Sequence, residues 1–418
     1  MCQAWRQLFT SRSSLWAELN CLDADKTRVY LERSKSSPIS LSLHRNNVLL
    51  PHDPLFQITP HAIGRLKSLY ACGTLSNLQD ITAQLSHPAP ILEEMWILGG
   101  GNPEYMQEPE DIPVLSPTLF GQELPSLREL HLEYVHTELP WKNMINLTSL
   151  MLFYASPVST GQLLDFFENA PHLRTAELLF ETPTSGVVQS GRLVSLAHLE
   201  KMNIDGDPPS ALLNHLLIPV GARLAVEVDF PSPPIKDQPP RFFDNLRNLP
   251  DFTTIHLFGG SLPSLEFNGP NGGVFMLPAA DMEEGTDIVL ESLILFDTTK
   301  TEHLEISSAN SQSSYIPYRA LLPMKALCTL ELYDCSSPHV FTRALDPSIS
   351  GVLVCPKLEH LAIEAYGMLN IKDVIRMAAA RESGGAKLKS LGILAQWGPA
   401  WSQLDLLELK NHVGHLEC

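Results

Sequence analysis

A short pattern of apolar residues recurs along most of the chain. In each copy a leucine is followed by an apolar residue three positions later and by another two positions after that, as in Leu127, Leu130 and Leu132. The last two positions point to one face of a short strand, because side chains alternate between the two faces of a strand. Other copies begin at Leu92, Leu147, Leu173, Leu199, Leu290, Leu327, Leu358 and Leu388. The pattern therefore predicts many short strands, each with one buried face.

The segments between these strands have the spacing of helices. A helix is predicted between Ser159 or Thr160, either of which can cap it, and Pro171, which ends it. Similar helices are predicted at residues 75–86, 209–217 and 371–380. Strands that alternate with helices are typical of α/β folds with parallel sheets.

The repeat period narrows this fold class. Leu147, Leu173 and Leu199 lie 26 residues apart, which is within the 20–29-residue period of leucine-rich repeats. We therefore predict an irregular leucine-rich-repeat-like solenoid over residues 23–418, in which short parallel strands alternate with helices. Between Phe230 and Asp287 the pattern lapses, and proline- and glycine-rich stretches indicate a loop-rich insertion at about 231–287.

Composition and charge limit the partners. The chain has 418 residues, of which 44% are apolar, so it can bury a large core. Its net charge of −18 repels phosphate backbones and favours basic partners, and we expect no nucleic acid ligand.

Membrane insertion and secretion are not expected either. The most apolar later stretch, residues 211–228, is interrupted by polar residues and is too polar to span a bilayer. The seven cysteines are scattered, with none at Cys-x-x-Cys spacing, and the N-terminal residues do not form a secretory signal. This usage is typical of reduced thiols and predicts an intracellular protein of the cytoplasm, the nucleus or both.

The strand positions that point away from the core are rich in acidic and aromatic residues. They include Glu94, Trp96, Glu129, His131, Glu133, Phe153, Glu177, Asp205, Phe296, Glu331, Tyr333 and Glu364. Aromatic anchors and complementary charge are features of binding surfaces, so we predict a concave platform for a basic, partly apolar protein segment. The alternative is that these residues only keep the strand faces solvated.

Recognised catalytic motifs are not found in the sequence, which has no Gly-x-Ser-x-Gly elbow and no His-Glu-x-x-His helix. The run Gly99 to Gly101 lacks the Lys-Ser/Thr ending of a phosphate loop. His412, His415 and Cys418 have metal-like spacing without a second ligand cluster. We expect no catalytic, cofactor-binding or metal-binding residues and a protein that is not an enzyme. An uncharacterised hydrolase built from dispersed Ser, His and Asp residues remains an alternative.

The N-terminal residues carry a more specific motif. It runs from Cys2-Gln-Ala-Trp5-Arg6-Gln-Leu8 through Ser14-Leu15-Trp16 to Tyr30-Leu31-Glu32-Arg33-Ser34 and Pro38-Ile39-Ser40-Leu41-Ser42-Leu43. This succession resembles the second half of an F-box, and the stretch after it, in the large F-box-like leucine-rich-repeat families of mushroom-forming fungi. By this resemblance residues 1–22 are the C-terminal part of a helical F-box, whose first half, usually opening with Leu-Pro, is expected to be missing from the chain.

The resemblance implies a substrate-recognition subunit of a cullin-RING ubiquitin ligase of the SCF type. In that family the F-box docks on a Skp-type adaptor, which implies an adaptor-docking role for Cys2, Trp5, Leu8, Leu15 and Trp16. Apart from Cys2, the same residues are expected to pack over the end of the first repeat. A ligase-independent leucine-rich-repeat scaffold with a non-functional partial F-box is the alternative. Both roles require binding and no chemistry.

Overall fold

The chain forms two compact units, Met1–Pro219 and Val220–Cys418, in the computed structural model. The structure describes residues 3–20, 24–45, 60–99, 113–137, 144–154, 159–179, 191–205, 212–226, 252–258, 264–269, 272–278, 287, 290, 293–294, 296–308, 314–366, 369–395 and 401–417.

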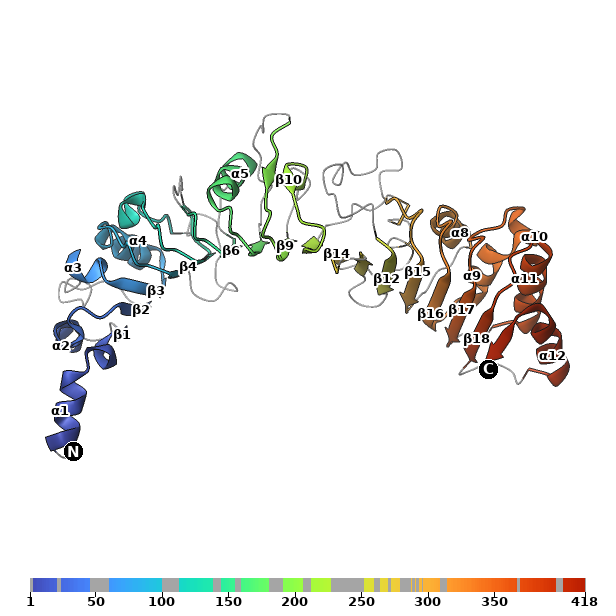
Figure 1. The fold of residues 1–418 in the computed structure, drawn as a ribbon, viewed down its shortest axis with the longest axis horizontal. Helices are drawn as coiled ribbons and strands as arrows, with labels where there is room; N and C mark the ends of the chain where they lie inside the picture. The colour runs from blue at the N-terminus through green and yellow to red at the C-terminus, as the bar shows by residue number, and fades with distance from the viewer. Residues whose placement is uncertain are drawn as a thin grey trace. The chain divides into compact units, whose positions relative to one another are not determined.

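The first unit is a parallel sheet with helices between its strands (Figure 1). Its sheet order is β1-β2-β3-β4-β5-β6-β7-β9, and β8 pairs with β10 in a separate parallel ribbon. The elements are α1 (Gln3–Ser11), η1 (Ser13–Trp16), β1 (Glu18–Asn20), α2 (Ala24–Ser34), β2 (Ile39–Arg45), α3 (Pro60–Ile63), β3 (Leu66–Gly73), α4 (Leu75–Gln84), β4 (Glu94–Gly99), η5 (Leu119–Gln122), β5 (Glu129–Glu133), β6 (Ser149–Phe153), α5 (Thr160–Asn169), β7 (Thr175–Leu179), β8 (Val194–Ser195), β9 (Lys201–Asp205) and β10 (Leu216–Leu217).

The repeated leucine pattern builds this sheet. Leu127 lies in the entry turn and Leu130 and Leu132 lie on one face of β5, and all three are at most 2% exposed. The same three positions are buried around β4, β6, β7 and β9. Helix α5 begins where its sequence predicts, because the Ser159 side chain accepts a hydrogen bond from the Gln162 backbone N–H and the Gln162 side chain accepts one from the Ser159 N–H.

The second unit is also a mixed α/β layer, and its helices α8, α9 and α11 lie on one side of the strands (Figure 1). Its sheet order is β11-β14-β13-β12-β15-β16-β17-β18-β19, in which only the neighbours of β13 run antiparallel to it. The elements are β11 (Arg223–Val226), β12 (Thr254–Phe258), β13 (Ser264–Asn268), β14 (Val274–Pro278), β15 (His303–Ser307), α8 (Tyr315–Leu321), β16 (Thr329–Cys335), α9 (Pro338–Leu345), α10 (Pro347–Ser350), β17 (His360–Ala365), α11 (Ile371–Ser383), β18 (Ser390–Ala395), α12 (Gln403–His412) and β19 (His415–Glu417).

The core of the second unit contains a fully buried arginine. Arg381 of α11 is 0% exposed, and its guanidinium donates hydrogen bonds of 2.8 Å to the backbone carbonyls of Val354 and Cys355. Burial lowers the pKa of Arg381. The side chain ties helix α11 to the turn that precedes β17, because both carbonyls belong to that turn.

Most predicted strands and helices are present, and three segments differ. The pattern starting at Leu290 does not form a strand in its described residues; β15 instead follows Thr301, which takes the leading position with Leu304 and Ile306 inside. The helix expected at 209–217 ends earlier, because Leu216 and Leu217 pair with β8. Residues 254–278, expected within a loop-rich insertion, form the antiparallel strands β12, β13 and β14. Residues 227–251 lie outside the described residues.

Taken within each unit, the chain is a mixed α/β protein whose mostly parallel strands alternate with helices. Along these strands buried positions alternate with partly exposed ones, so each sheet has one buried face and one open face. The open faces hold most of the residues that the sequence pattern selected as a binding platform.

Candidate binding surfaces

The N-terminal residues form a short helical segment with exposed apolar side chains. Leu8 on α1 is 43% exposed and Leu15 in η1 is 51% exposed, so neither packs over the first repeat as expected. Trp16 does pack, with its ring 5.1 Å from that of Tyr30 and its indole N–H donating to the Phe9 carbonyl at 2.8 Å. Trp5 lies on α1, and Cys2 lies outside the described residues.

The first open face is the surface of β2 to β7 and β9 that points away from the core of the first unit. Strand register aligns its side chains in rows across the sheet, and the middle row consists of Ser42, Tyr70, Trp96, His131, Met151, Glu177 and Asn203. The flanking rows hold the predicted residues Glu94, Glu129, Glu133, Phe153 and Asp205. The register thus brings together eight residues that the sequence pattern selected one strand at a time.

His131 lies in the middle of this face and is only 8% exposed. Its ring lies between Trp96, at 4.8 Å between centroids, and Phe153, at 5.3 Å and edge-on. Nε2 lies 3.4 Å from a Glu133 carboxylate oxygen, and neither ring nitrogen has a hydrogen-bond partner among the described residues. Burial lowers the pKa of His131 and outweighs the opposing effect of the Glu133 carboxylate, so the ring is neutral at neutral pH.

The charges on this face are unevenly paired. Glu177 forms an ion pair of 2.7 Å with Lys201, which lies at an outward position of β9. Glu94 and Glu129 are exposed and adjacent in register, and neither has an ion-pair partner among the described residues. Uncompensated negative charge on the first open face therefore lies beside Trp96.

A hollow of about 580 Å³ lies next to Trp96 on the same face. Its lining combines hydroxyl, aromatic and carboxylate groups from successive strands, among them Glu18, Ser40, Ser68, Tyr70, Glu94 and Trp96. Tyr70 was missed in sequence analysis because the leucine pattern was not recognised in residues 66–73. In the structure, buried and partly exposed residues alternate along most of this strand, β3. The hollow is large enough to accept a side chain of a partner.

The second open face belongs to β12 and β15 to β18 of the second unit. It carries the predicted Glu331 and Tyr333 on β16 and Glu364 on β17. The Tyr333 hydroxyl donates a hydrogen bond of 3.1 Å to Glu331. Burial, that hydrogen bond and the carboxylates of Glu331, Glu305 and Glu364 all raise the pKa of Tyr333.

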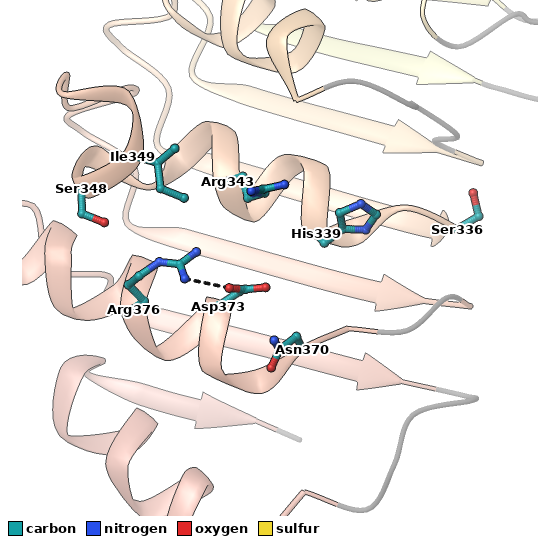
Figure 2. A pocket seen from close by; sticks show the side chains of 8 residues that line it. All are labelled: Ser336, His339, Arg343, Ser348, Ile349, Asn370, Asp373 and Arg376. Carbon is teal, nitrogen blue, oxygen red and sulfur yellow. Dashed lines mark ion pairs between the residues drawn. The ribbon is translucent and has the colours of Figure 1, made fainter.

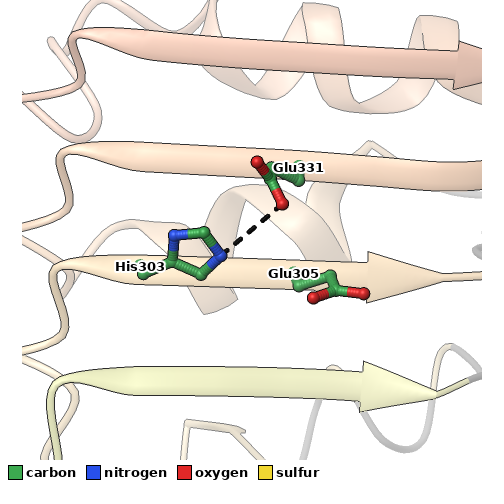
Figure 3. A group of neighbouring side chains, drawn as sticks. All are labelled: His303, Glu305 and Glu331. Atoms are coloured by element: carbon green, nitrogen blue, oxygen red, sulfur yellow. Dashed lines mark ion pairs between the residues drawn. The ribbon is translucent and has the colours of Figure 1, made fainter.

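Beside Glu331 the second open face holds histidines that sequence analysis did not select. His303 and Glu305 of β15 lie next to Glu331 of β16, with 3.6 Å between His303 Nε2 and a Glu331 oxygen (Figure 3). Nδ1 of His256 on β12 lies 2.8 Å from a carboxylate oxygen of Glu305, which accepts a hydrogen bond from it. His303 was missed because the strand was expected at the pattern starting at Leu290, and His256 was missed because residues 254–258 were expected to lie in a loop-rich insertion.

Phe296 does not belong to either open face. It lies outside the strands and packs against Phe267 and Phe275, with ring centroids 4.6 and 6.1 Å away. Its assignment to the binding face is corrected, because that assignment assumed a strand at residues 293–296.

A histidine and a serine contact each other across the neighbouring strands β17 and β18. The His360 ring nitrogen Nδ1 lies 2.7 Å from the Ser390 hydroxyl, and Nε2 lies 3.9 Å from Glu359, whose carboxylate is already bound by Lys389 at 2.6 Å. His360 is about half exposed. Burial raises the pKa of the Cys335 thiol to about 11 and that of Cys355 to about 12, so neither provides a thiolate at neutral pH.

A second hollow, of about 750 Å³, lies on the helix side of the second unit between α9 and α11 (Figure 2). His339, Arg343 and Arg376 line it, which suggests anion binding at first sight. Arg376, however, is bound by Asp373 at 2.9 Å and by the buried Asp346 at 2.8 Å. The positive charge of Arg376 is therefore already neutralised.

The other motifs noted in the sequence have structural explanations. His412 forms an ion pair of 2.8 Å with Glu382, while His415 lies on β19 and Cys418 is outside the described residues. Gly99 ends β4 where an added Cβ would lie 1.9 Å from the Tyr134 carbonyl oxygen, so close backbone packing accounts for the glycine there.

Among the described residues, no helix is both long and apolar enough to cross a membrane. No family model matches the chain, and no curated protein matches it either.

Proposed function

We propose that this chain is a non-catalytic binding protein, and that the first open face binds a basic, partly apolar segment of a partner protein. The observation that carries the proposal is the juxtaposition of Trp96, His131 and Phe153 with the exposed carboxylates of Glu94 and Glu129. Lysine and arginine side chains are attracted both to aromatic ring faces and to carboxylates. A neutral His131 adds no positive charge that would oppose such a ligand.

The shape and composition of the face favour a protein ligand. The hollow beside Trp96 accepts one side chain, and the exposed strand face beyond it accepts an extended segment. The net charge of −18 disfavours nucleic acid, whose phosphates would meet Glu94 and Glu129. Buried aromatic anchors with polar groups around them are typical of protein interfaces.

We further propose that the parallel strands and helices form a leucine-rich-repeat-like solenoid and that the chain recruits its partner to a cullin-RING ubiquitin ligase. The support is the resemblance of the N-terminal residues to the later part of an F-box. In addition, Leu8, Phe9 and Leu15 are each more than 40% exposed around α1 and η1, where an adaptor would dock. A ligase-independent scaffold is the alternative.

Co-purification separates these two proposals. A Skp-type adaptor is expressed with the full chain, with a Leu8→Asp/Leu15→Asp variant, and with a chain carrying a restored N-terminal half F-box. Capture by the full chain and loss of capture in the variant support ligase recruitment. Capture by none of them supports the scaffold, and capture only by the restored chain shows that the present N-terminus is insufficient.

Charge reversal tests the binding face itself. A fluorescently labelled peptide of Arg, Lys and Leu residues is titrated with the full chain and with Glu94→Lys/Glu129→Lys. We expect at least about tenfold weaker binding for this variant, since each surface charge pair contributes up to about 1 kcal/mol and both pairs become repulsive. The control Glu32→Lys/Glu408→Lys makes the same change in net charge on helices α2 and α12.

The control decides how the result is read. If both double variants weaken binding equally, the peptide responds to net charge and the first open face is not its site. If Glu94→Lys/Glu129→Lys alone weakens binding, the site is on the first open face.

A further inference from the structure

A separate feature of the second unit points to a metal site that the proposed binding function does not require. His303 and Glu305 are two positions apart on β15, so both side chains point to the second open face. Glu305 lies directly opposite Glu331 of β16 in the strand register, and His256 of β12 lies directly opposite Glu305 on its other side. Four side chains that can bind a metal thus share one patch of sheet.

This arrangement places two carboxylates side by side. Like charges directly opposite each other on neighbouring strands destabilise a sheet. The side-chain exposures of His303, Glu305 and Glu331 are 31%, 24% and 28%, so water screens this repulsion only in part. A cation placed between the two carboxylates would remove the repulsion.

The geometry is close to that of a metal centre. One donor atom from each of His303, Glu305 and Glu331 lies within 4.8 Å of the other two, and the distance from His303 Nε2 to the Glu331 oxygen is 3.6 Å (Figure 3). Ligand atoms about 2.1 Å from a tetrahedral metal are about 3.4 Å apart. Small side-chain rotations are therefore enough to bring all three donors into coordination distance.

The surroundings supply the outer hydrogen bonds that metal ligands need. Glu305 is bonded to His256 at 2.8 Å, and Glu331 accepts a hydrogen bond from the Tyr333 hydroxyl at 3.1 Å. Such partners orient coordinating carboxylates. On the far side of Glu331 the same row continues with Ala362 and Gly392, which leave room for a water or a partner group on the metal.

We propose that His303, Glu305 and Glu331 bind one divalent transition-metal ion of the zinc class, with His256 and Tyr333 as outer partners. One imidazole and two carboxylates suit zinc better than calcium or magnesium, which prefer all-oxygen sites. Three protein ligands leave a coordination position open for water or for a donor group of a partner.

The test measures zinc binding by the untagged full chain after treatment with a chelator and dialysis. Calorimetric titration with zinc chloride is expected to show one site that is weakened at least tenfold in His303→Gln and in Glu305→Gln. His360→Gln is the matched control, because His360 lies on the same open face beside a carboxylate but outside the cluster. Cobalt titration should give the visible absorption bands of a four-coordinate site.

Thermal unfolding provides the second measurement. Zinc should raise the Tm of the full chain and of His360→Gln, and it should leave the Tm of Glu305→Gln unchanged, because binding to the native state alone stabilises it. The isosteric Glu305→Gln change removes one of two adjacent like charges, so this variant is expected to fold. Wild-type protein that binds no stoichiometric zinc, or a Glu305→Gln variant that binds it as wild type does, would overturn the proposal.

Discussion

Arg381 gives the most quantitative test of how the second unit is held together. We consider Arg381→Ala, which removes a side chain that is 0% exposed and that joins α11 to the turn before β17. Two hydrogen bonds of 2.8 Å are lost, one to the Val354 carbonyl and one to the Cys355 carbonyl. Cys355 keeps a partner in the Leu358 backbone N–H, whereas no other backbone donor to Val354 is found in the described residues.

The expected loss of stability follows from these contacts. A buried carbonyl left without a donor costs about 1–3 kcal/mol, and the space left by the side chain adds a further cost. Removal of a buried charge, whose desolvation lowers the pKa of Arg381, offsets part of this. We expect a net loss of about 3 kcal/mol for Arg381→Ala and about 2 kcal/mol for Arg381→Met, which refills most of the volume.

Calorimetric unfolding of the full chain measures the effect. A loss of about 3 kcal/mol lowers the Tm of a unit of this size by roughly 6–12 °C. Arg343→Ala is the control, because Arg343 is exposed on α9 and its loss should cost less than about 0.5 kcal/mol. If the Tm of Arg381→Ala equals that of Arg343→Ala, the guanidinium does not hold the turn and the reasoning is refuted.

Three further predictions concern the first unit and one glycine of the second. Gly99→Ala should lower the yield of folded protein and reduce the free energy of unfolding by at least about 2 kcal/mol, because the added Cβ would lie 1.9 Å from the Tyr134 carbonyl oxygen. Gly392→Ala is the control, because no atom lies within 4 Å of its added Cβ, and it should fold normally. A solubility and thermal-shift assay compares the two variants. Ser159→Ala should lower the free energy of unfolding in urea by about 1 kcal/mol, because it breaks the capping box of α5. Thr10→Ala on the exposed helix α1 is the control and should leave that free energy unchanged. Burial lowers the pKa of His131 in the folded state, so the unfolded chain takes up the proton first and stability should fall as the pH drops below the unfolded pKa of about 6.5. His131→Phe should remove this part of the pH dependence in unfolding curves measured between pH 8 and pH 5, and an unchanged slope would contradict the assignment.

The strands could be predicted where three apolar positions recur, because each position has one structural role. Leu127, Leu130 and Leu132 were recognised in this way, and all three are buried. The strand β15 escaped because Thr301, a buried threonine, takes the place of the leading leucine. Hydropathy alone does not distinguish a threonine that is buried at the leading position of a strand from a threonine in a loop.

The candidate sites could be predicted only in part, for a related reason. Strand alternation places Glu94 or Glu129 on an open face, but the register between strands decides which residues are neighbours. That register placed Lys201 beside Glu177 and His303 beside Glu331, from segments 24 and 28 residues apart. The lengths of the intervening turns and helices set these pairs, and the sequence pattern does not determine those lengths precisely enough.

Oxidative footprinting tests the central claim most directly, because it shows which face of the first unit a ligand covers. The full chain is exposed to hydroxyl radicals with and without a saturating basic peptide, and modification is read by mass spectrometry. We predict that Trp96, Tyr70 and Met151 on the first open face are protected, while Tyr315, which is 62% exposed in the second unit, reacts equally in both samples. Peptide binding that leaves Trp96 and Met151 as reactive as before would contradict the proposed binding face.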